Sequence, residues 1–263
     1  RSRDVANIIK QPFTTTLGTS NYRAGVNAGN SIASGGNYNV CVGDEAGTAI
    51  STGDNNTLIG YVAGDAISTS SANTAVGSFA MTSMTDGAEN VAVGTSALDV
   101  CTKGSKTVAV GRNALGSQIF TSATDTFNTA VGFKAGFSIT TGINNTLIGG
   151  QAAGDMTDAD YNTAVGFNAM TTNQLGSRSV AVGFEALKTQ NPDNAADMLN
   201  VGVGFNAGTA ITTGVQNTVI GGSAGGTLTT GANNTLLGKG TNVDTAAREG
   251  AIALGHDLGT HAA

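Results

Sequence analysis

The sequence predicts an all-β fold: a parallel β-solenoid with 17-residue coils. A short phrase, Asn-Thr-Ala-Val-Gly-Phe-Asn-Ala-Met at residues 162–170, returns in variant form along the chain. Its glycine recurs at a regular 17-residue spacing, which is interrupted only by two 21-residue intervals. A fixed period over many copies is typical of solenoids, in which each repeat forms one coil. The repeat glycines are Gly43, Gly60, Gly77, Gly94, Gly111, Gly132, Gly149, Gly166, Gly183, Gly204, Gly221, Gly238 and Gly255.

The three residues before each repeat glycine predict a short strand. Counted from that glycine as position 0, position −1 is Val, Ile or Leu, position −3 is Val, Ile or Thr, and position −2 is mostly Ala or Leu. β-Branched residues followed by glycine favour a strand that ends in a bend. Because side chains alternate, positions −1 and −3 share one face. We expect the larger side chains at position −1 to fill the interior, so that Val165→Asp prevents folding, and the small side chains at position −2 to face a close neighbour.

The rest of each coil carries further periodic positions. Position +3 is Ala in eleven of the thirteen copies, which indicates a close approach of two backbones. Position +7 predicts a second short strand that faces the interior, and Gly at position −7 predicts a second corner at positive φ. The apolar side chains at position +7 are Ile50, Ile67, Met84, Cys101, Ile139, Met156, Ile211 and Leu228, and the glycines at position −7 are Gly36, Gly53, Gly87, Gly104, Gly142, Gly176, Gly214 and Gly231.

Position −4 is Asn in ten copies, from Asn39 to Asn234. Stacked asparagine side chains can hydrogen-bond their equivalents in the coils above and below. Glycosylation at Asn-x-Thr, for example at Asn55, is the weaker interpretation because the recurrence follows the repeat.

Three segments make up the chain. Residues 1–20 carry no repeat and are expected to be an N-terminal adaptor or capping segment. Residues 21–259 form the solenoid of about 13–14 coils, and residues 260–263 are expected to continue into a longer protein or to be capped by a partner. Four-residue insertions lengthen two of the coils, near residues 118–125 and 190–197. We expect the two inserted loops on similar sides of the column, four coils apart.

Composition argues against several partners. Net charge is −6 and the twelve Lys and Arg residues are scattered, so nucleic acid is not an expected partner. No apolar stretch approaches the ~20 residues of a membrane helix, so membrane insertion is not expected. Cys41 and Cys101 fall in different coils, too far apart for a disulfide, and are interpreted as buried small hydrophobes.

No motif indicates catalysis, and we expect a protein that is not an enzyme and has no catalytic residue, cofactor or metal. His256 and His261 lie in the final degenerate stretch, where a solvated terminal segment is favoured over a metal site. The acidic pairs Asp44-Glu45 and Asp158/Asp160 do not recur with the repeat. We interpret them as solvated turn residues rather than a calcium or glycosidase site.

Aromatic residues recur at position +1, and three of them fall in successive coils. We expect a stacked ladder there, which serves either as a sugar-stacking strip or, as we favour, in packing between chains. The aromatic side chains at position +1 are Tyr61, Phe133, Phe167, Phe184 and Phe205.

The repeats of this chain resemble those of two protein families. Val-Ala-Val-Gly-x-x-Ala at residues 91–97 and Ala-Ile-Ala-Leu-Gly at residues 251–255 resemble the head repeats of trimeric autotransporter adhesins, whose period is usually shorter. Asn-Thr-Leu-Ile-Gly and Asn-Thr-Ala-Val-Gly are similar to repeat regions of tail-fibre-like proteins of bacteriophages. The resemblance covers about residues 24–259. It implies a left-handed parallel β-roll in each chain and a homotrimer about a common axis.

From this resemblance we expect a structural or adhesive virion protein, a trimeric tail-fibre or appendage shaft that presents loops to a host surface. Expected partners are other virion or surface proteins at both ends and a host surface glycan, with a location in the virion or at the cell surface. The alternatives are a bacterial trimeric adhesin or extracellular filament subunit and, more weakly, an ice- or polysaccharide-binding solenoid. The candidate surface-contact residues are Gln118, Phe120, Gln190, Asn191, Asp193 and Asn194.

Overall fold

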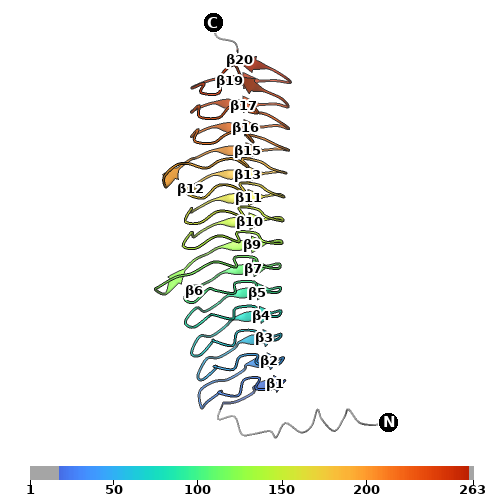
Figure 1. The fold of residues 1–263 in the computed structure, drawn as a ribbon, viewed down its shortest axis with the longest axis vertical. Coiled ribbons are helices and arrows are strands. Elements are labelled where there is room, and N and C mark those ends of the chain that lie inside the picture. The colour runs from blue at the N-terminus through green and yellow to red at the C-terminus, as the bar shows by residue number, and fades with distance from the viewer. Residues whose placement is uncertain (1–17, 261–263) are drawn as a thin grey trace, which may run out of the picture.

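The strands of successive coils pair in parallel and form one 14-stranded sheet along the molecule (Figure 1). The computed structural model describes residues 18–260, and within them no helix is present. Residues at the same repeat position pair, as in Thr146 with Thr163. The strands of the sheet are β1 (Tyr22–Ala24), β2 (Val40–Val42), β3 (Thr57–Ile59), β4 (Thr74–Val76), β5 (Val91–Val93), β7 (Val108–Val110), β9 (Thr129–Val131), β10 (Thr146–Ile148), β11 (Thr163–Val165), β13 (Val180–Val182), β15 (Val201–Val203), β16 (Thr218–Ile220), β17 (Thr235–Leu237) and β19 (Ile252–Leu254).

The predicted parallel β-solenoid with 17-residue coils is therefore confirmed. At a strand spacing of about 4.8 Å, the sheet is about 60 Å long. Most of the adaptor or capping segment expected at residues 1–20, and residues 261–263 with His261, lie outside the described residues.

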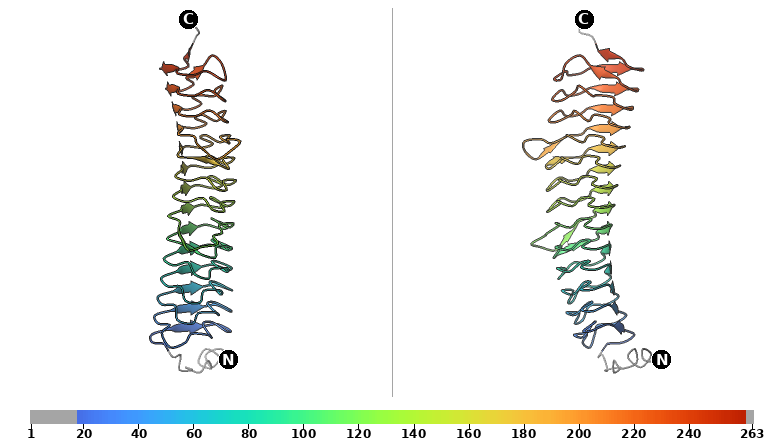
Figure 2. Two further views of the ribbon diagram at one scale, coloured as in Figure 1. Left: turned by 90° about the vertical axis from the view of Figure 1, so that its left-hand side faces the viewer. Right: turned by 45° about the vertical axis from the view of Figure 1, so that its right-hand side comes forward.

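Three smaller pairs of two-residue strands lie away from the main sheet. They are β6 (Gly104–Ser105) with β8 (Thr124–Asp125), β12 (Gly176–Ser177) with β14 (Ala196–Asp197), and β18 (Asn242–Val243) with β20 (Gly259–Thr260). The first two pairs hold the inserted loops. Both loops stand out from the same side of the column, as predicted (Figures 1 and 2).

Positions −2, +3 and +7 fill the interior, so the prediction that position −1 does so is wrong. Ala164 at −2 and Ala169 at +3 are fully buried, as is Met156 at +7. By contrast, Ile59 and Ile148 at −1 expose 38% and 40% of their surface. The alternation of side chains along each strand is confirmed. However, the middle residue of the strand, at position −2, faces the interior, whereas the residues at −1 and −3 face outward.

The interior stays narrow because large and small residues alternate between positions −2 and +4. Where −2 is large, +4 is small: Leu58 is followed by Gly64, at which an added Cβ would lie 2.7 Å from the Leu58 side chain. Where −2 is Ala75, +4 is Met81, and both are fully buried. In most coils one large side chain fills this layer, at the close packing typical of protein interiors. Where both positions are small, as at Gly202 and Gly208, the Leu187 side chain of the preceding coil fills it.

The repeat glycine is required for two independent reasons. Gly166 has φ +137°, a conformation that L-residues rarely adopt. An added Cβ would also lie 2.3 Å from the carbonyl oxygen of Gly183 in the next coil. The prediction of positive φ at position −7 is wrong: Gly142 lacks it, whereas its added Cβ would lie 2.5 Å from the carbonyl oxygen of Ala159. Left-handed residues occur instead at positions −5, +2 and +4.

The second strand expected at position +7 is also absent from residues 18–260. The side chains at +7 are buried as predicted, for example Ile139 and Leu228, but the backbone around them forms turns. Hydrogen bonds between coils continue through these turns, as from the backbone N–H of Thr140 to the carbonyl oxygen of Thr157 at 3.0 Å. Coil stacking therefore does not need a second sheet.

The predicted asparagine ladder is confirmed, and it connects side chains mostly to backbone. Asn145 Nδ2 donates to the carbonyl oxygen of Ala159 at 2.8 Å, and Asn145 Oδ1 accepts from the backbone N–H of Asn162 at 2.9 Å. Its own backbone N–H donates to Oδ1 of Asn128 at 2.9 Å. The same bonds recur in the other regular coils, where these asparagines are buried. Within a run of regular coils, each asparagine thus joins three consecutive coils.

We predict that Asn145→Leu lowers the free energy of unfolding by about 2–4 kcal/mol, because it leaves the carbonyl of Ala159 and the N–H of Asn162 buried without partners. Asn144→Asp, on the adjacent half-buried residue, is the control and should change stability by less than about 0.5 kcal/mol. Denaturant unfolding at one protein concentration measures both. Equal effects would show that the ladder does not stabilise the column.

We predict that Leu58→Ala and Gly64→Met compensate each other, because together they recreate the Ala75/Met81 pair of the next coil. Leu58→Ala alone should cost about 3 kcal/mol through its cavity. Gly64→Met alone should cost a similar amount through overlap with Leu58. In a double-mutant cycle, the pair should cost about 2 kcal/mol less than the sum. Additive costs would contradict the size compensation.

Candidate interaction surfaces

The outer face of the main sheet is an uncharged strip. The first and last residues of all its strands point outward, and every one of them is Val, Thr, Ile, Leu, Ala or Tyr. A strip of this length and three residues in width covers roughly 600 Å². Half of the residues at position −3 are threonines, so only the position −1 side of the strip is continuously aliphatic. Contiguous apolar patches of a few hundred Å² mark interaction sites. The outward aliphatic residues that were expected in the interior form this strip instead.

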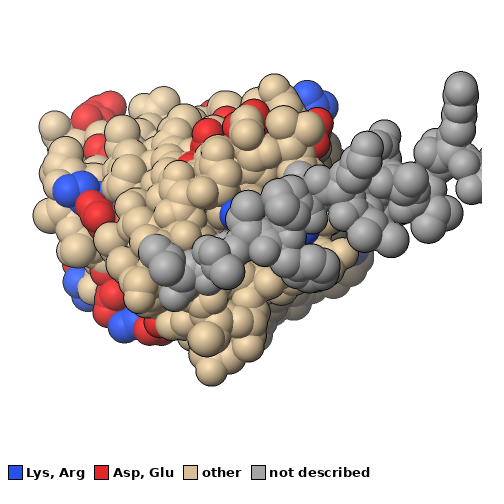
Figure 3. Space-filling model, turned by 90° about the horizontal axis from the view of Figure 1, so that it is seen from below, with Lys and Arg blue, Asp and Glu red and all other residues tan. Residues whose placement is uncertain are grey.

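The charged side chains lie elsewhere on the column. Seen from its lower end, they gather along two margins, and other residues make up most of the surface in view (Figure 3). Arg178 and Asp197 pair at 3.0 Å beside one inserted loop, and Lys106 pairs with Asp125 beside the other. The ion pairs therefore fix the bases of the loops rather than interrupt the strip.

Phe167, Phe184 and Phe205 form the predicted ladder. Their ring centroids are 5.8 Å and 5.2 Å apart, with interplanar angles of 15° and 9°. They expose 49%, 41% and 57% of their surface. The other aromatic side chains at position +1 lie apart: Tyr61 meets Phe79 edge to face, and Phe133 contacts Arg112 and Lys134. Three coils thus present stacked phenylalanines at the surface.

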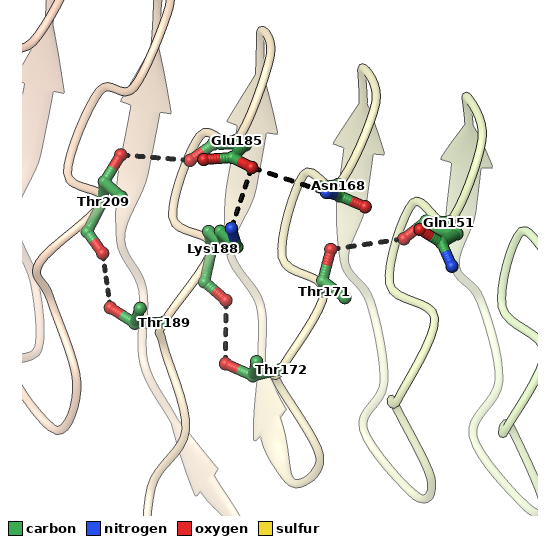
Figure 4. Close-up of polar contacts among 8 residues, drawn as sticks. All are labelled: Gln151, Asn168, Thr171, Thr172, Glu185, Lys188, Thr189 and Thr209. Carbon is green, nitrogen blue, oxygen red and sulfur yellow. Dashed lines mark hydrogen bonds and ion pairs between the residues drawn. The ribbon is translucent and has the colours of Figure 1, made fainter.

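Polar side chains beside this ladder bind neighbouring coils (Figure 4). The Glu185 carboxylate accepts hydrogen bonds from Lys188 at 2.8 Å and Asn168 at 3.4 Å, and the bond from Lys188 is the main cause of the lowered pKa of Glu185. Nearby threonine hydroxyls donate to backbone carbonyls, as from Thr172 to Lys188 at 2.8 Å. This group is a structural network between coils.

The candidate contact residues of the inserted loops divide into three groups by their burial. Gln118 and Gln190 are fully buried and Phe120 is 8% exposed, so their predicted role as surface contacts is wrong. The reason is that both glutamines occupy position +7, which points inward in every coil from Ile50 to Leu228. Asn191 is half-buried and accepts a hydrogen bond from the backbone N–H of Gln174 at 3.2 Å. The remaining candidates, Asp193 and Asn194, are exposed and stay a prediction.

The buried glutamines lie in polar layers of the core, in the two coils where Thr or Ser replaces the ladder asparagine. Ser179 replaces asparagine before the second long coil, and Gln190 Oε1 accepts from Ser179 at 3.3 Å and from Asn200 Nδ2 at 2.9 Å. Before the first long coil, the Thr107 hydroxyl bonds that of Thr126 at 2.6 Å. The Gln118 amide has no partner there. Sequence reasoning missed these layers, although position +7 was already predicted to be internal.

We predict opposite effects of one substitution at these equivalent sites. Gln118→Met should raise the free energy of unfolding by about 1–2 kcal/mol, because it replaces an unpartnered buried amide with the residue type found at Met84 and Met156. Gln190→Met should lower it by about 1–3 kcal/mol, because Ser179 and Asn200 lose an acceptor. Thermal unfolding of both variants measures the difference, and effects of the same sign would contradict it.

Within residues 18–260, no group of three His, Cys, Asp or Glu side chains is placed to hold a metal ion. Asp158 accepts hydrogen bonds from the hydroxyls of Thr140 and Thr141, which lower its pKa. Burial raises the pKa of both free thiols, Cys41 and Cys101, to about 11, so they stay protonated at neutral pH. His256 Nδ1 lies 3.0 Å from the Asp257 carboxylate. In this described part of the chain, no helix is long and apolar enough to cross a membrane.

No protein-family model, curated protein or solved structure matches the chain. A solenoid fold does not by itself determine function. A function therefore has to be inferred from the surface. Three surface features are candidate interaction sites: the uncharged strip, the phenylalanine ladder and the exposed loop tips.

Proposed function

We propose that the chain is the shaft of a homotrimeric bacteriophage tail fibre or related appendage, a structural and adhesive protein without enzymatic activity. The left-handed winding and the three-chain packing implied by the resemblance are part of this proposal. One observation carries it: an uncharged strip runs along the outer face of the whole 14-stranded sheet. Such a strip suits permanent burial against other copies.

The size of the strip supports this assembly. Burying roughly 600 Å² on each of two chains removes about 1,200 Å² from water, at the lower end of stable interfaces. No charged group would need to be desolvated, because the strip has none. Obligate interfaces are the more hydrophobic kind, and closed symmetry keeps such a face from making open-ended contacts.

The inserted loops suit the presentation of contacts away from the shaft. Both stand on one side of the column, and their tips, at Thr121, Ser122, Asp193 and Asn194, are exposed. We propose that they approach a host surface, with a surface glycan as a candidate ligand. Other virion or surface proteins would join the ends of the shaft, and the location would be the virion or the cell surface.

A bacterial surface adhesin or extracellular filament subunit would be stabilised in the same way, by burial of the strip between chains. The neighbouring genes separate these possibilities: tail or capsid genes favour the virion part, and an outer-membrane β-barrel downstream favours the adhesin. An ice- or polysaccharide-binding solenoid is a second candidate. The outward threonines favour it, because Thr57, Thr74, Thr129, Thr146 and Thr163 stand on a regularly spaced sheet, although valine interrupts them.

We predict that the protein is a trimer resistant to SDS and heat, and that Val165→Asp yields a folded monomer. Val165 lies on the strip, so a carboxylate there would be buried in the interface but solvated in the single chain. Light scattering measures the mass and circular dichroism the fold. Asn194→Asp, at a loop tip, is the control and should leave the trimer intact.

A monomeric wild-type protein at micromolar concentration would contradict the trimer. If that monomer also inhibited ice growth, and Thr146→Lys abolished the inhibition, the ice-binding candidate would replace the shaft.

A further inference from the structure

The phenylalanine ladder ends beside a glycine. Position +1 is Phe205 in one coil, Gly222 in the next and Lys239 in the one after. Because these residues occupy one column, Gly222 leaves a gap of one rung between an exposed ring and an exposed ammonium group.

Neither the backbone nor the packing of this chain requires glycine at position 222. Its φ lies outside the left-handed region, and an added Cβ would meet only the carbonyl oxygen of Phe205, at 4.0 Å. The repeat glycine next to it, Gly221, has φ +135° and an added Cβ 2.5 Å from Gly238. A side chain would fit at position 222, yet the space is left open.

The other end of the ladder differs. Gly150 precedes Phe167 in the same column, but an added Cβ at Gly150 would lie 3.2 Å from the Phe167 ring. That ring therefore covers its neighbouring glycine. Phe205, by contrast, is the most exposed ring of the ladder, at 57%. The open gap is thus specific to the Gly222 coil.

The height of the gap matches one ring. Two coil spacings separate the backbone levels of Phe205 and Lys239, about 10 Å. A ring placed halfway would lie about 5 Å from each, a distance at which aromatic rings stack and an ammonium attracts a ring face. Within the ladder, adjacent rings already lie 5.2 Å and 5.8 Å apart.

We infer that this gap binds one aromatic side chain of a partner polypeptide, stacked on Phe205 and covered by Lys239. The chain uses the same combination elsewhere: Arg112 lies 5.9 Å from the Phe133 ring in this same column, and Arg178 lies 5.2 Å from the Tyr161 ring. A saccharide ring could stack on Phe205, but it has no π face for the ammonium group of Lys239 to cover. The inference does not depend on trimer formation.

The test uses N-acetyl-tryptophanamide as the probe and the full-length chain as the receptor. Saturation-transfer NMR should show contact between protein and indole protons, with weak affinity because a single ring buries little area. Gly222→Phe should weaken binding roughly tenfold or more, because the added ring fills the gap as a fourth rung. Thr95→Phe, which adds a ring at an exposed +1 position far from the gap, should leave binding unchanged.

Lys239→Met tests the covering cation and should weaken binding several-fold while circular dichroism stays native. Three outcomes would overturn the inference: no contact with the probe in the wild-type protein, unchanged binding in Gly222→Phe, or equal binding of methyl glucoside. A changed oligomeric state in Gly222→Phe would also overturn it, because the ring would then come from a second copy of this chain.

Discussion

The buried asparagine ladder is the interaction on which the rest of the column depends. Each asparagine amide reaches a carbonyl 14 residues further on and the next asparagine 17 residues further on. The same two bonds span 15 and 18 residues from Asn21, so the ladder holds the coil length to within one residue. The exceptions support this reasoning: Thr107 and Ser179 replace asparagine directly before the two 21-residue coils, and there hydroxyl groups continue the hydrogen bonding. Both four-residue insertions thus follow a position where the amide is exchanged for a hydroxyl group.

A fixed coil length encloses a narrow interior, and this explains the exterior. With alanine at +3 and one large side chain shared between −2 and +4, no room remains for the β-branched residues at −1 and −3. They face outward along the sheet and form the uncharged strip. The feature that supports assembly is thus a consequence of how the single chain packs, whereas the loops are additions at the two junctions.

Much of this was predictable from the sequence. The period, the three-residue strand, the glycine bend, the asparagine ladder, the phenylalanine ladder and the shared side of the loops follow from the repeat. The face of the strand that points inward was not predictable, because both faces are apolar and alternation alone does not choose between them. The deciding signal was present: Leu58 with Gly64 and Ala75 with Met81 exchange size, as residues in one packed layer must. Gln118 and Gln190 were predicted as contacts because they adjoin the inserted loops, but their +7 position places them inside the column.

Hydrogen exchange of the asparagine side chains tests the central role of the ladder most directly. NMR can follow the Nδ2 protons of Asn56, Asn145 and Asn217 beside those of Asn55 and Asn144, their neighbours at position −5. The ladder predicts strong protection of the first three and fast exchange of the other two, because only the first three donate inside the column. Similar exchange rates in both groups would contradict it.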